Sequence, residues 1–264
     1  MRILVTNDDG YTAKGLVAVA GALVSAGHDV FVVAPMSERS GSGSSLGSIE
    51  NGKRIPLIET HLPDDPAVPV YALDCPPALT AVAACAGTFG PRPDLVISGV
   101  NPGHNTGRSI LFSSTVGALL AARVAGVGGA AVSCGFEPSG RYDTAAEVAV
   151  RVADWMIRTE NTRLMLNVNV PDVDFAELRG VAATKLGARS MFSLRTERVD
   201  DGVILRRDER SSGFRQGTDS AAVAGGYVSV TVLKGITGSD DHAALDDSGD
   251  SLIRILEREA SSAT

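Results

Sequence analysis

The fold class can be predicted from residues 2–34, which read RILVTNDDGYTAKGLVAVAGALVSAGHDVFVVA. Arg2 to Thr6 is a short apolar run that predicts a strand, and Phe31 to Ala34 predicts a second, buried strand. Apolar side chains recur between them at helical spacing: Leu16, Val19, Ala20, Leu23 and Val24. A strand, a helix and a strand within about 35 residues form a βαβ unit, which implies parallel strands. The stretch predicts an α/β protein, a three-layer Rossmann-like sandwich with a mainly parallel central sheet.

The same alternation continues to about residue 180, which we interpret as the end of the Rossmann-like core. Further strands are predicted at Val68 to Leu73, Asp94 to Ser98, Ala130 to Ser133 and Leu164 to Val170. Helices are predicted at Pro77 to Ala86, from Ser114 or Thr115 onward with one of these residues as the N-cap, and at Tyr142 to Arg158.

The pattern changes after residue 180, where shorter strand candidates are separated by charged, glycine-rich turns. These candidates are Val181 to Lys185, Val203 to Arg206 and Tyr227 to Leu233. They predict a β-rich extension over about 181–237, followed by an acidic tail over 238–264 in which Leu252 to Glu259 form a helix. We expect residues 1–264 to form a single domain, because α/β folds of this length commonly do.

Composition narrows the classes of partner. The formal net charge of −7 argues against a nucleic-acid polymer, which requires a dense Lys/Arg surface, but it leaves a small anionic substrate open. Cys75, Cys85 and Cys134 stand far apart, so we expect reduced, buried thiols and neither a disulfide framework nor a thiolate zinc site. Without a signal-peptide pattern or an apolar run of about 18 residues, the sequence predicts a cytoplasmic protein with no membrane partner.

Two adjacent carboxylates, Asp8 and Asp9, directly follow the first predicted strand, where open α/β sheets bind ligands. Two such groups repel each other unless a proton or a cation lies between them, and oxygen ligands suit Mg²⁺ or Mn²⁺. A plain Asn-Asp-Asp-Gly turn is the alternative. Asn7 stands where an aspartyl-phosphate phosphatase has its nucleophile, which disfavours a covalent route. The third strand of a receiver domain would end in an Asp, but here it ends in SGVN.

A second polar segment, SGVNPGHNTG at 98–107, follows the strand Asp94 to Ser98 and offers Asn101 and Asn105 beside flexible glycines. It is either a ligand-binding loop or a glycine-bearing turn. Ser113, Ser114 and Thr115 lie at a predicted helix start, where hydroxyl and free N–H groups suit a phosphate. The glycines of residues 41–47 do not open a helix after a strand, so a dinucleotide fingerprint is a poor match.

Five motifs in this order resemble the SurE survival-protein family. They are TNDDG at 6–10, PMSERSGSGSSL at 35–46, SGVNPGHNTG at 98–107, SSTV at 113–116 and GTDSAAVAGGYVS at 217–229. The resemblance covers residue 1 to about 235, and it replaces the interpretation of the Ser/Gly stretch as a flexible linker. It implies a metal-dependent phosphomonoesterase, a 5'/3'-nucleotidase that hydrolyses nucleoside monophosphates with water activated by the metal.

The resemblance also implies which residues act. One divalent ion per subunit, Mg²⁺ or Mn²⁺ with Ca²⁺ as a substitute in crystals, is expected on Asp8, Asp9, Ser40 and Asn101. The phosphate group is expected at Asn105, Ser113 and Thr115, with Asn7 supporting the metal loop beside them. Either Asp8 or Asp9 would serve as the catalytic base. The family further implies a homodimer or homotetramer in which residues of about 185–235 reach a neighbouring subunit.

The chain departs from the family pattern around the expected substrate pocket. Phe112 replaces the usual tyrosine, Ser114 replaces a glycine, and the GTPxDC segment is reduced to YALDCPP. Two alternatives therefore stay open: a phosphatase for another small phosphate ester, such as a sugar or secondary-metabolite phosphate, and a non-catalytic nucleotide- or metal-binding module. We expect His104 to face solvent, the alternative being an acid for the leaving group, and Arg39 either pairs with phosphate or holds the Ser40 loop.

Overall fold

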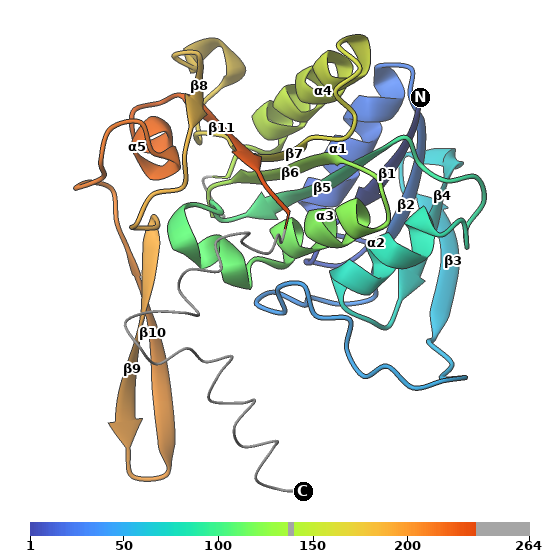
Figure 1. The fold of residues 1–264 in the computed structure, drawn as a ribbon, viewed down its shortest axis with the longest axis horizontal. Helices are drawn as coiled ribbons and strands as arrows, with labels where there is room; N and C mark the ends of the chain where they lie inside the picture. The colour runs from blue at the N-terminus through green and yellow to red at the C-terminus, as the bar shows by residue number, and fades with distance from the viewer. Residues whose placement is uncertain (137–139, 236–264) are drawn as a thin grey trace, which may run out of the picture. The chain divides into compact units, whose positions relative to one another are not determined.

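A computed structural model describes residues 1–136 and 140–235, and Met1–Leu233 form one compact unit (Figure 1). Its centre is a nine-stranded sheet in the order β3-β4-β2-β1-β5-β6-β7-β11-β8. The strands from β4 to β7 in this order pair in parallel, β3 pairs antiparallel with β4, and β11 pairs antiparallel with β7. The predicted α/β class with a mainly parallel central sheet is confirmed.

The core of the sheet consists of short strands that are buried on both faces. These are β1 (Arg2–Thr6), β2 (Asp29–Pro35), β5 (Leu95–Pro102), β6 (Gly129–Cys134) and β7 (Met165–Asn169). The outer strands on the β2 side are β3 (Leu57–Leu62) and β4 (Asp65–Leu73). Continuous apolar runs of this kind are typical of parallel strands covered by helices on both sides.

Helices cover both faces of the sheet and complete the three layers. Helices α1 (Lys14–Ser25) and α4 (Tyr142–Arg158) lie on one face, and α2 (Pro77–Cys85) and α3 (Ser114–Val124) lie on the other (Figure 1). Leu16, Val19 and Leu23 of α1 are fully buried against the sheet, as the helical spacing predicts. The predicted cap of α3 is off by one residue, because the hydroxyl of Ser113 accepts the hydrogen bond from the Val116 N–H group.

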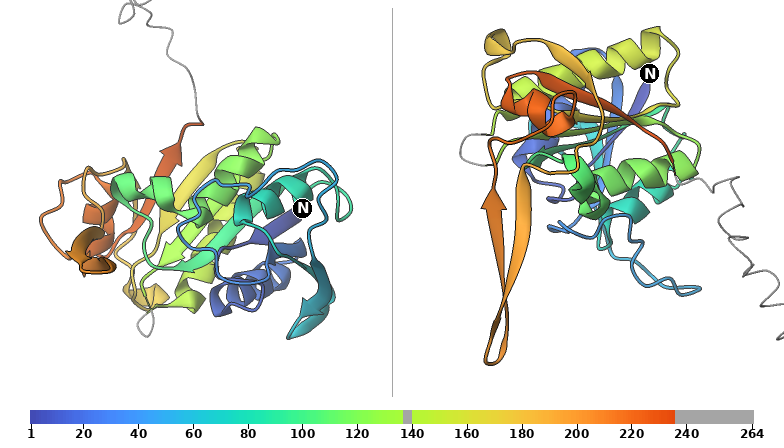
Figure 2. Two further views of the ribbon diagram at one scale, coloured as in Figure 1. Left: turned by 90° about the horizontal axis from the view of Figure 1, so that it is seen from below. Right: turned by 60° about the vertical axis from the view of Figure 1, so that its left-hand side comes forward.

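The predicted β-rich extension divides into two parts in the structure. Strands β8 (Val181–Thr184) and β11 (Val228–Leu233) join the edge of the central sheet, together with the short helix α5 (Asp219–Ala224). Only β9 (Phe192–Val199) and β10 (Gly202–Glu209) form a separate antiparallel hairpin, which projects away from the sandwich (Figure 2). Two short 3₁₀ helices, η1 (Gly107–Phe112) and η2 (Phe175–Glu177), lie in connections.

Two strands are absent from the sequence-based prediction for the same reason. Nearly all of β3 is exposed, and the side chains of β9 are exposed or only partly buried, so neither segment shows the apolar pattern of a buried strand. The three cysteines are free thiols and buried, as predicted. None of the helices in the described ranges is both long and apolar enough to cross a membrane. The predicted helix Leu252 to Glu259 lies outside these ranges.

Candidate active site

The site forms where two neighbouring parallel strands end. Strands β1 and β5 pair directly, with Thr6 opposite Ser98, so the segments that follow them share one edge of the sheet. The pairing of β5 with β6 is irregular between Ser98 and Asn101 and resumes with Asn101 opposite Ser133, so Asn101 lies at the end of β5. The carboxyl edge of an open parallel sheet is where such folds bind ligands.

The Asn-Asp-Asp-Gly turn after β1 holds two carboxylates at this edge. The Asn7 side-chain amide donates to the Gly10 carbonyl oxygen at 2.9 Å, which closes the turn. Asp8 is buried, and its Oδ1 accepts a hydrogen bond from the Thr115 hydroxyl at 2.8 Å. Asp9 is half-buried, and its Oδ2 is a buried atom without a partner in the described part of the chain. The turn therefore holds one hydrogen-bonded and one unpartnered carboxylate.

Burial raises the pKa of both carboxyl groups far above their ordinary range. The pKa of Asp8 is raised to about 6, chiefly because burial disfavours its charged form, although the Thr115 hydrogen bond opposes the shift. The pKa of Asp9 is raised to about 7 by burial and then by the negative charges of Asp8 and Glu38. Two adjacent acids that resist ionisation are stabilised by a cation between them.

The Ser/Gly segment after β2 is a fixed wall of the site. The Arg39 N–H group donates to the Asp8 carbonyl oxygen at 2.7 Å, and the Ser114 hydroxyl donates to the Arg39 carbonyl oxygen at 3.0 Å. A Cβ on Gly117 of α3 would lie 2.1 Å from the Gly43 carbonyl oxygen, so glycine permits this close approach. The Arg39 guanidinium pairs with Asp74, which agrees with the role of holding the Ser40 loop.

The Asn101 loop presents an amide oxygen. The Asn101 Nδ2 donates to the Gly103 carbonyl oxygen at 2.6 Å, which leaves Oδ1 as the atom that can accept or ligate. Gly103 has φ +122°, and a Cβ there would lie 2.5 Å from the Phe136 ring. The expectation that His104 faces solvent is wrong. His104 is buried, its Nε2 lies 2.9 Å from the Val170 carbonyl oxygen, and burial lowers its pKa.

Asn105 and Thr115 form a chain of hydrogen bonds that ends on Asp8. The Asn105 Nδ2 donates to the Ser133 hydroxyl at 2.8 Å and to the Thr115 hydroxyl at 3.4 Å, and Thr115 in turn donates to Asp8. These donor groups point at the protein, and Thr115 is fully buried. Ser113 caps α3 through its oxygen, so its own hydroxyl hydrogen stays free to donate.

One cavity of ≈ 530 Å³ collects most of the residues that the sequence singles out. Six of the eight predicted site residues line it: Asp8, Asp9, Ser40, Asn101, Asn105 and Ser113. The other two, Asn7 and Thr115, are buried behind the wall, where they hold the acidic turn. The departures Phe112 and Ser114 also line this cavity.

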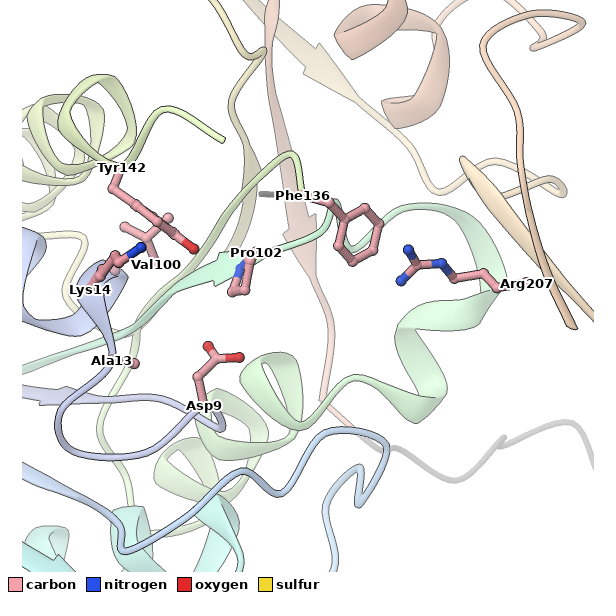
Figure 3. Close-up of a pocket in the computed structure, with 9 residues that line it drawn as sticks. Asp9, Ala13, Lys14, Val100, Pro102, Phe136, Tyr142 and Arg207 are labelled. Carbon is pink, nitrogen blue, oxygen red and sulfur yellow. The ribbon is translucent and has the colours of Figure 1, made fainter. Parts of the chain in front are cut away.

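The far wall of the cavity comes from segments that the sequence did not indicate. Phe136 follows β6, and Phe192, Leu194 and Arg207 come from the hairpin. The Arg207 guanidinium lies 3.8 Å from the centre of the Phe136 ring. Figure 3 shows both side chains across an adjoining pocket from Asp9. No motif marks these residues, because their position depends on how the hairpin leaves the sandwich.

The residues present fit a hard divalent cation. Asp9 Oδ2 is a buried oxygen without a partner in the described ranges, and Asn101 offers a free amide oxygen. Among the described residues there is no group of three or more His, Cys, Asp or Glu side chains that could hold a metal. The donors are two carboxylates plus neutral oxygens, which suit Mg²⁺ or Mn²⁺ better than a thiophilic metal.

Comparisons with known proteins agree with this geometry. The family model described as survival protein SurE matches residues 3–193. The 5'-nucleotidase SurE of Synechococcus elongatus is 34% identical over 245 residues, with coverage of 89% of this chain and 93% of that protein. The 5'-nucleotidase SurE of Desulfitobacterium hafniense strain DCB-2 is 36% identical over 239 residues, with coverage of 88% and 90%.

A solved structure supports the same assignment. The crystal structure of the SurE protein from Aquifex aeolicus superposes with a TM-score of 0.77 at 29% identity, covering 97% of this chain and 100% of that chain. Fold, site and relatives together define a phosphoric monoester hydrolase. The chain belongs to the survival protein SurE family.

Proposed function

We propose that the protein is a metal-dependent 5'-nucleotidase that hydrolyses nucleoside monophosphates to nucleoside and phosphate. The relatives named 5'-nucleotidase SurE support the activity. The observation that carries the proposal is the acidic pair at the floor of the cavity, where Asp9 Oδ2 is buried without a described partner. A buried carboxylate oxygen left without a hydrogen bond is costly unless a ligand completes it.

Four residues would hold one divalent ion, Mg²⁺ or Mn²⁺: Asp8, Asp9, Ser40 and Asn101. All four line the same cavity and offer oxygen atoms. When bound, the ion would neutralise phosphate charge and favour ionisation of the attacking water. The Thr115 hydroxyl hydrogen bond holds the Asp8 carboxylate in place, whereas the Asp9 side chain has no hydrogen bond in the described ranges, so one Asp9 oxygen could ligate the ion and the other could accept a proton. We therefore assign the proton-accepting role to Asp9.

We propose that Asn7, Asn105, Ser113 and Thr115 form the phosphate-binding set. Their hydrogen bonds indicate which of them would contact the phosphate directly and which would act through another residue. Ser113 has a free hydroxyl hydrogen at the start of α3, where N–H groups also favour an anion. Asn105 and Thr115 would act indirectly, by orienting Asp8 through their hydrogen bonds. Asn7 would hold the shape of the turn. Ser113 is thus the side chain of this set that would donate directly to the ester.

The far wall supports a nucleoside as the leaving group. Phe112, Phe136, Phe192 and Leu194 line the same cavity as the acidic pair and give it an apolar and aromatic surface. Aromatic faces bind the flat surface of a nucleobase by stacking, with a contribution of about 1–3 kcal/mol per base. A sugar phosphate would leave this wall without a partner, so we expect nucleotides to be preferred.

A phosphate-release assay over nucleoside and sugar monophosphates tests the proposal. We expect release from nucleoside monophosphates with Mg²⁺ or Mn²⁺, and none with EDTA. Faster turnover of a sugar phosphate would instead assign another phosphate ester as the substrate. Metal-dependent binding without release from any ester would identify a non-catalytic nucleotide-binding module and contradict the proposal.

We also propose that the hairpin β9–β10 mediates assembly into a homodimer or homotetramer. Most of its side chains are exposed, including Val203 and Leu205 at 65% and 63%. Exposed strands of this kind favour pairing with another chain. Sedimentation of the full chain and of a variant with Val203 and Leu205 both changed to Ser tests this, since loss of the apolar contacts should yield monomers. A cytoplasmic location stays a prediction of the sequence.

A further inference from the structure

A second pocket of ≈ 500 Å³ lies apart from the catalytic cavity and shares none of its lining residues. It is built from three segments: the first turn of η1, the loop after β8, and the loop before α5. Four cationic side chains line it, and they are Arg108, Lys185, Arg189 and Arg215. No carboxylate side chain lines this pocket, although the whole chain carries a net charge of −7. Phe214 adds one aromatic ring.

The four cations stand without partners in the part of the chain that the structure describes. None of their own side chains makes an ion pair or a hydrogen bond there, and the hydroxyls of Ser220 and Thr218 bond only to main-chain oxygens of Arg189 and Arg215. The neighbouring hairpin behaves differently, because Arg206 pairs with Glu197 and Arg195 pairs with Asp208. Clustered like charges repel each other, so an unpaired group of four is stabilised by an anion that binds between them.

The segments that carry these cations are fixed by one buried acid. Asp219 is fully buried and accepts hydrogen bonds from the N–H groups of Gly107 at 2.6 Å, Gly187 at 2.9 Å and Ser220 at 2.8 Å. Gly107 precedes Arg108, and Gly187 lies between Lys185 and Arg189 in the sequence. The Lys185 N–H group also bonds to the Gly217 carbonyl oxygen. The pocket is therefore preformed, so little ordering is needed when a ligand binds.

We propose that this pocket is a binding site for a nucleoside di- or triphosphate, with the phosphate chain on the four cations and the base against Phe214. Guanidinium groups match phosphate oxygens in paired hydrogen bonds. A monophosphate brings too little negative charge to neutralise four cations, whereas a di- or triphosphate brings more. The volume lies within the range of small-molecule sites, about 300–1,000 Å³. The site would respond to a nucleotide other than the proposed substrate, and it does not depend on the proposed catalytic function.

Titration calorimetry with ADP in the presence of EDTA tests this site, because chelation removes metal-dependent binding and turnover. We expect ADP to bind the full-length protein and its Asp9→Asn variant equally well. Arg189→Gln and Arg215→Gln should each weaken ADP binding about tenfold, since each removes a charged hydrogen bond. Arg158→Gln is the matched control, because Arg158 is exposed at the end of α4 and lines neither pocket. We expect it to change the affinity less than twofold.

Binding of pyrophosphate and of AMP tests the contributions of the phosphate chain and of the base separately. ADP should bind more tightly than either, and Phe214→Leu should weaken ADP but not pyrophosphate. Equal binding of pyrophosphate and ADP would overturn the assignment to a nucleotide. The proposal would also be wrong if ADP binding required Asp9, or if Arg189→Gln and Arg215→Gln altered the sedimentation coefficient while leaving ADP affinity unchanged. That last result would assign the cations to contact between copies of the chain.

Discussion

Two buried acidic regions of this protein differ in how many hydrogen bonds their carboxylate oxygens accept. Asp219 accepts three backbone N–H groups, from Gly107, Gly187 and Ser220, and both of its oxygens are used. At the other region, Asp8 and Asp9 lie side by side, one oxygen of Asp9 has no partner in the described ranges, and burial raises the pKa of both groups. A completed carboxylate joins segments of the chain, whereas an incomplete pair leaves room for a ligand.

We expect the loss of phosphate release to be greatest when one acid of the Asp8–Asp9 pair is replaced. Asp9→Asn removes one negative charge and the proposed proton acceptor, so metal-dependent phosphate release should fall at least about a thousandfold, equivalent to about 4 kcal/mol in the barrier. The change is nearly isosteric, and circular dichroism should show an unchanged fold. Asp64→Asn, in the exposed turn between β3 and β4, is the matched control and should keep full activity. An unchanged rate in Asp9→Asn would show that the proposed site is wrong.

Replacement of Asp219, whose two oxygens are both hydrogen-bonded, should reduce stability more than activity. Asp219→Asn places an NH₂ group opposite the Gly107 N–H group, so that a strong hydrogen bond becomes a contact between two donors. We expect the free energy of unfolding to fall by about 3 to 4 kcal/mol. Phosphate release per folded molecule should fall less than about tenfold. Denaturant unfolding measures the first quantity, and Asp201→Asn is the exposed control. Normal stability combined with lost activity would contradict the distinction between the two regions.

The dependence of stability on pH sharpens the same distinction. In the folded, metal-free protein the pKa values are about 6 for Asp8 and about 7 for Asp9, against an ordinary value of 3.8. Between pH of about 4 and 7 the folded state therefore holds protons that the unfolded chain has released, so its stability falls as the pH rises. Because both groups contribute, we expect a loss of several kcal/mol across this window in EDTA, with Asp9 as the larger source. Melting in EDTA should show a smaller loss for Asp9→Asn, and added Mg²⁺ or Mn²⁺ should remove most of it. An equal loss in both proteins would exclude Asp9 as a source.

A smaller effect is expected from the hydrogen bond between the Thr115 hydroxyl and the Asp8 carboxylate. Thr115→Val removes the hydroxyl that donates to Asp8, so the metal concentration for half-maximal activity should rise about tenfold. Thr115→Ser restores the hydroxyl and should restore the metal requirement. If Thr115 instead contacts the phosphate directly, the KM for nucleotide would rise while the metal requirement stays the same.

The sequence predicts the fold wherever burial leaves a periodic pattern. The unit from Arg2 to Ala34 and the helix Tyr142–Arg158 are confirmed because one face, or both, meets the core. Strand β9 escapes prediction because its side chains are exposed or only partly buried. Strands β8 and β11 are recognised as strands, but their membership of the central sheet depends on long-range pairing that no local pattern reveals.

The sequence predicts the floor of the site better than its far wall. Asp8 and Asp9 follow β1 directly and Asn101 lies at the end of β5, so topology alone brings them to one edge. The sequence does not reveal in which direction a side chain forms its hydrogen bonds. In the structure, Thr115 and Asn105 point toward Asp8, and His104 points inward to Val170. Arg207 reaches the cavity only through the geometry of the hairpin, which composition does not indicate.

Three side chains of the far wall belong to the hairpin, and this position bears on how selectivity among phosphate esters could be changed. In the described part of the chain, the two strands that carry Phe192, Leu194 and Arg207 pair only with each other, whereas Asp8 and Asp9 lie within the first ten residues. If the proposed function holds, grafting a different ribbon in place of 192–209 would exchange the surface proposed to meet the leaving group and keep Asp8 and Asp9 in place. Discrimination among esters can thus evolve, or be engineered, as an interchangeable module.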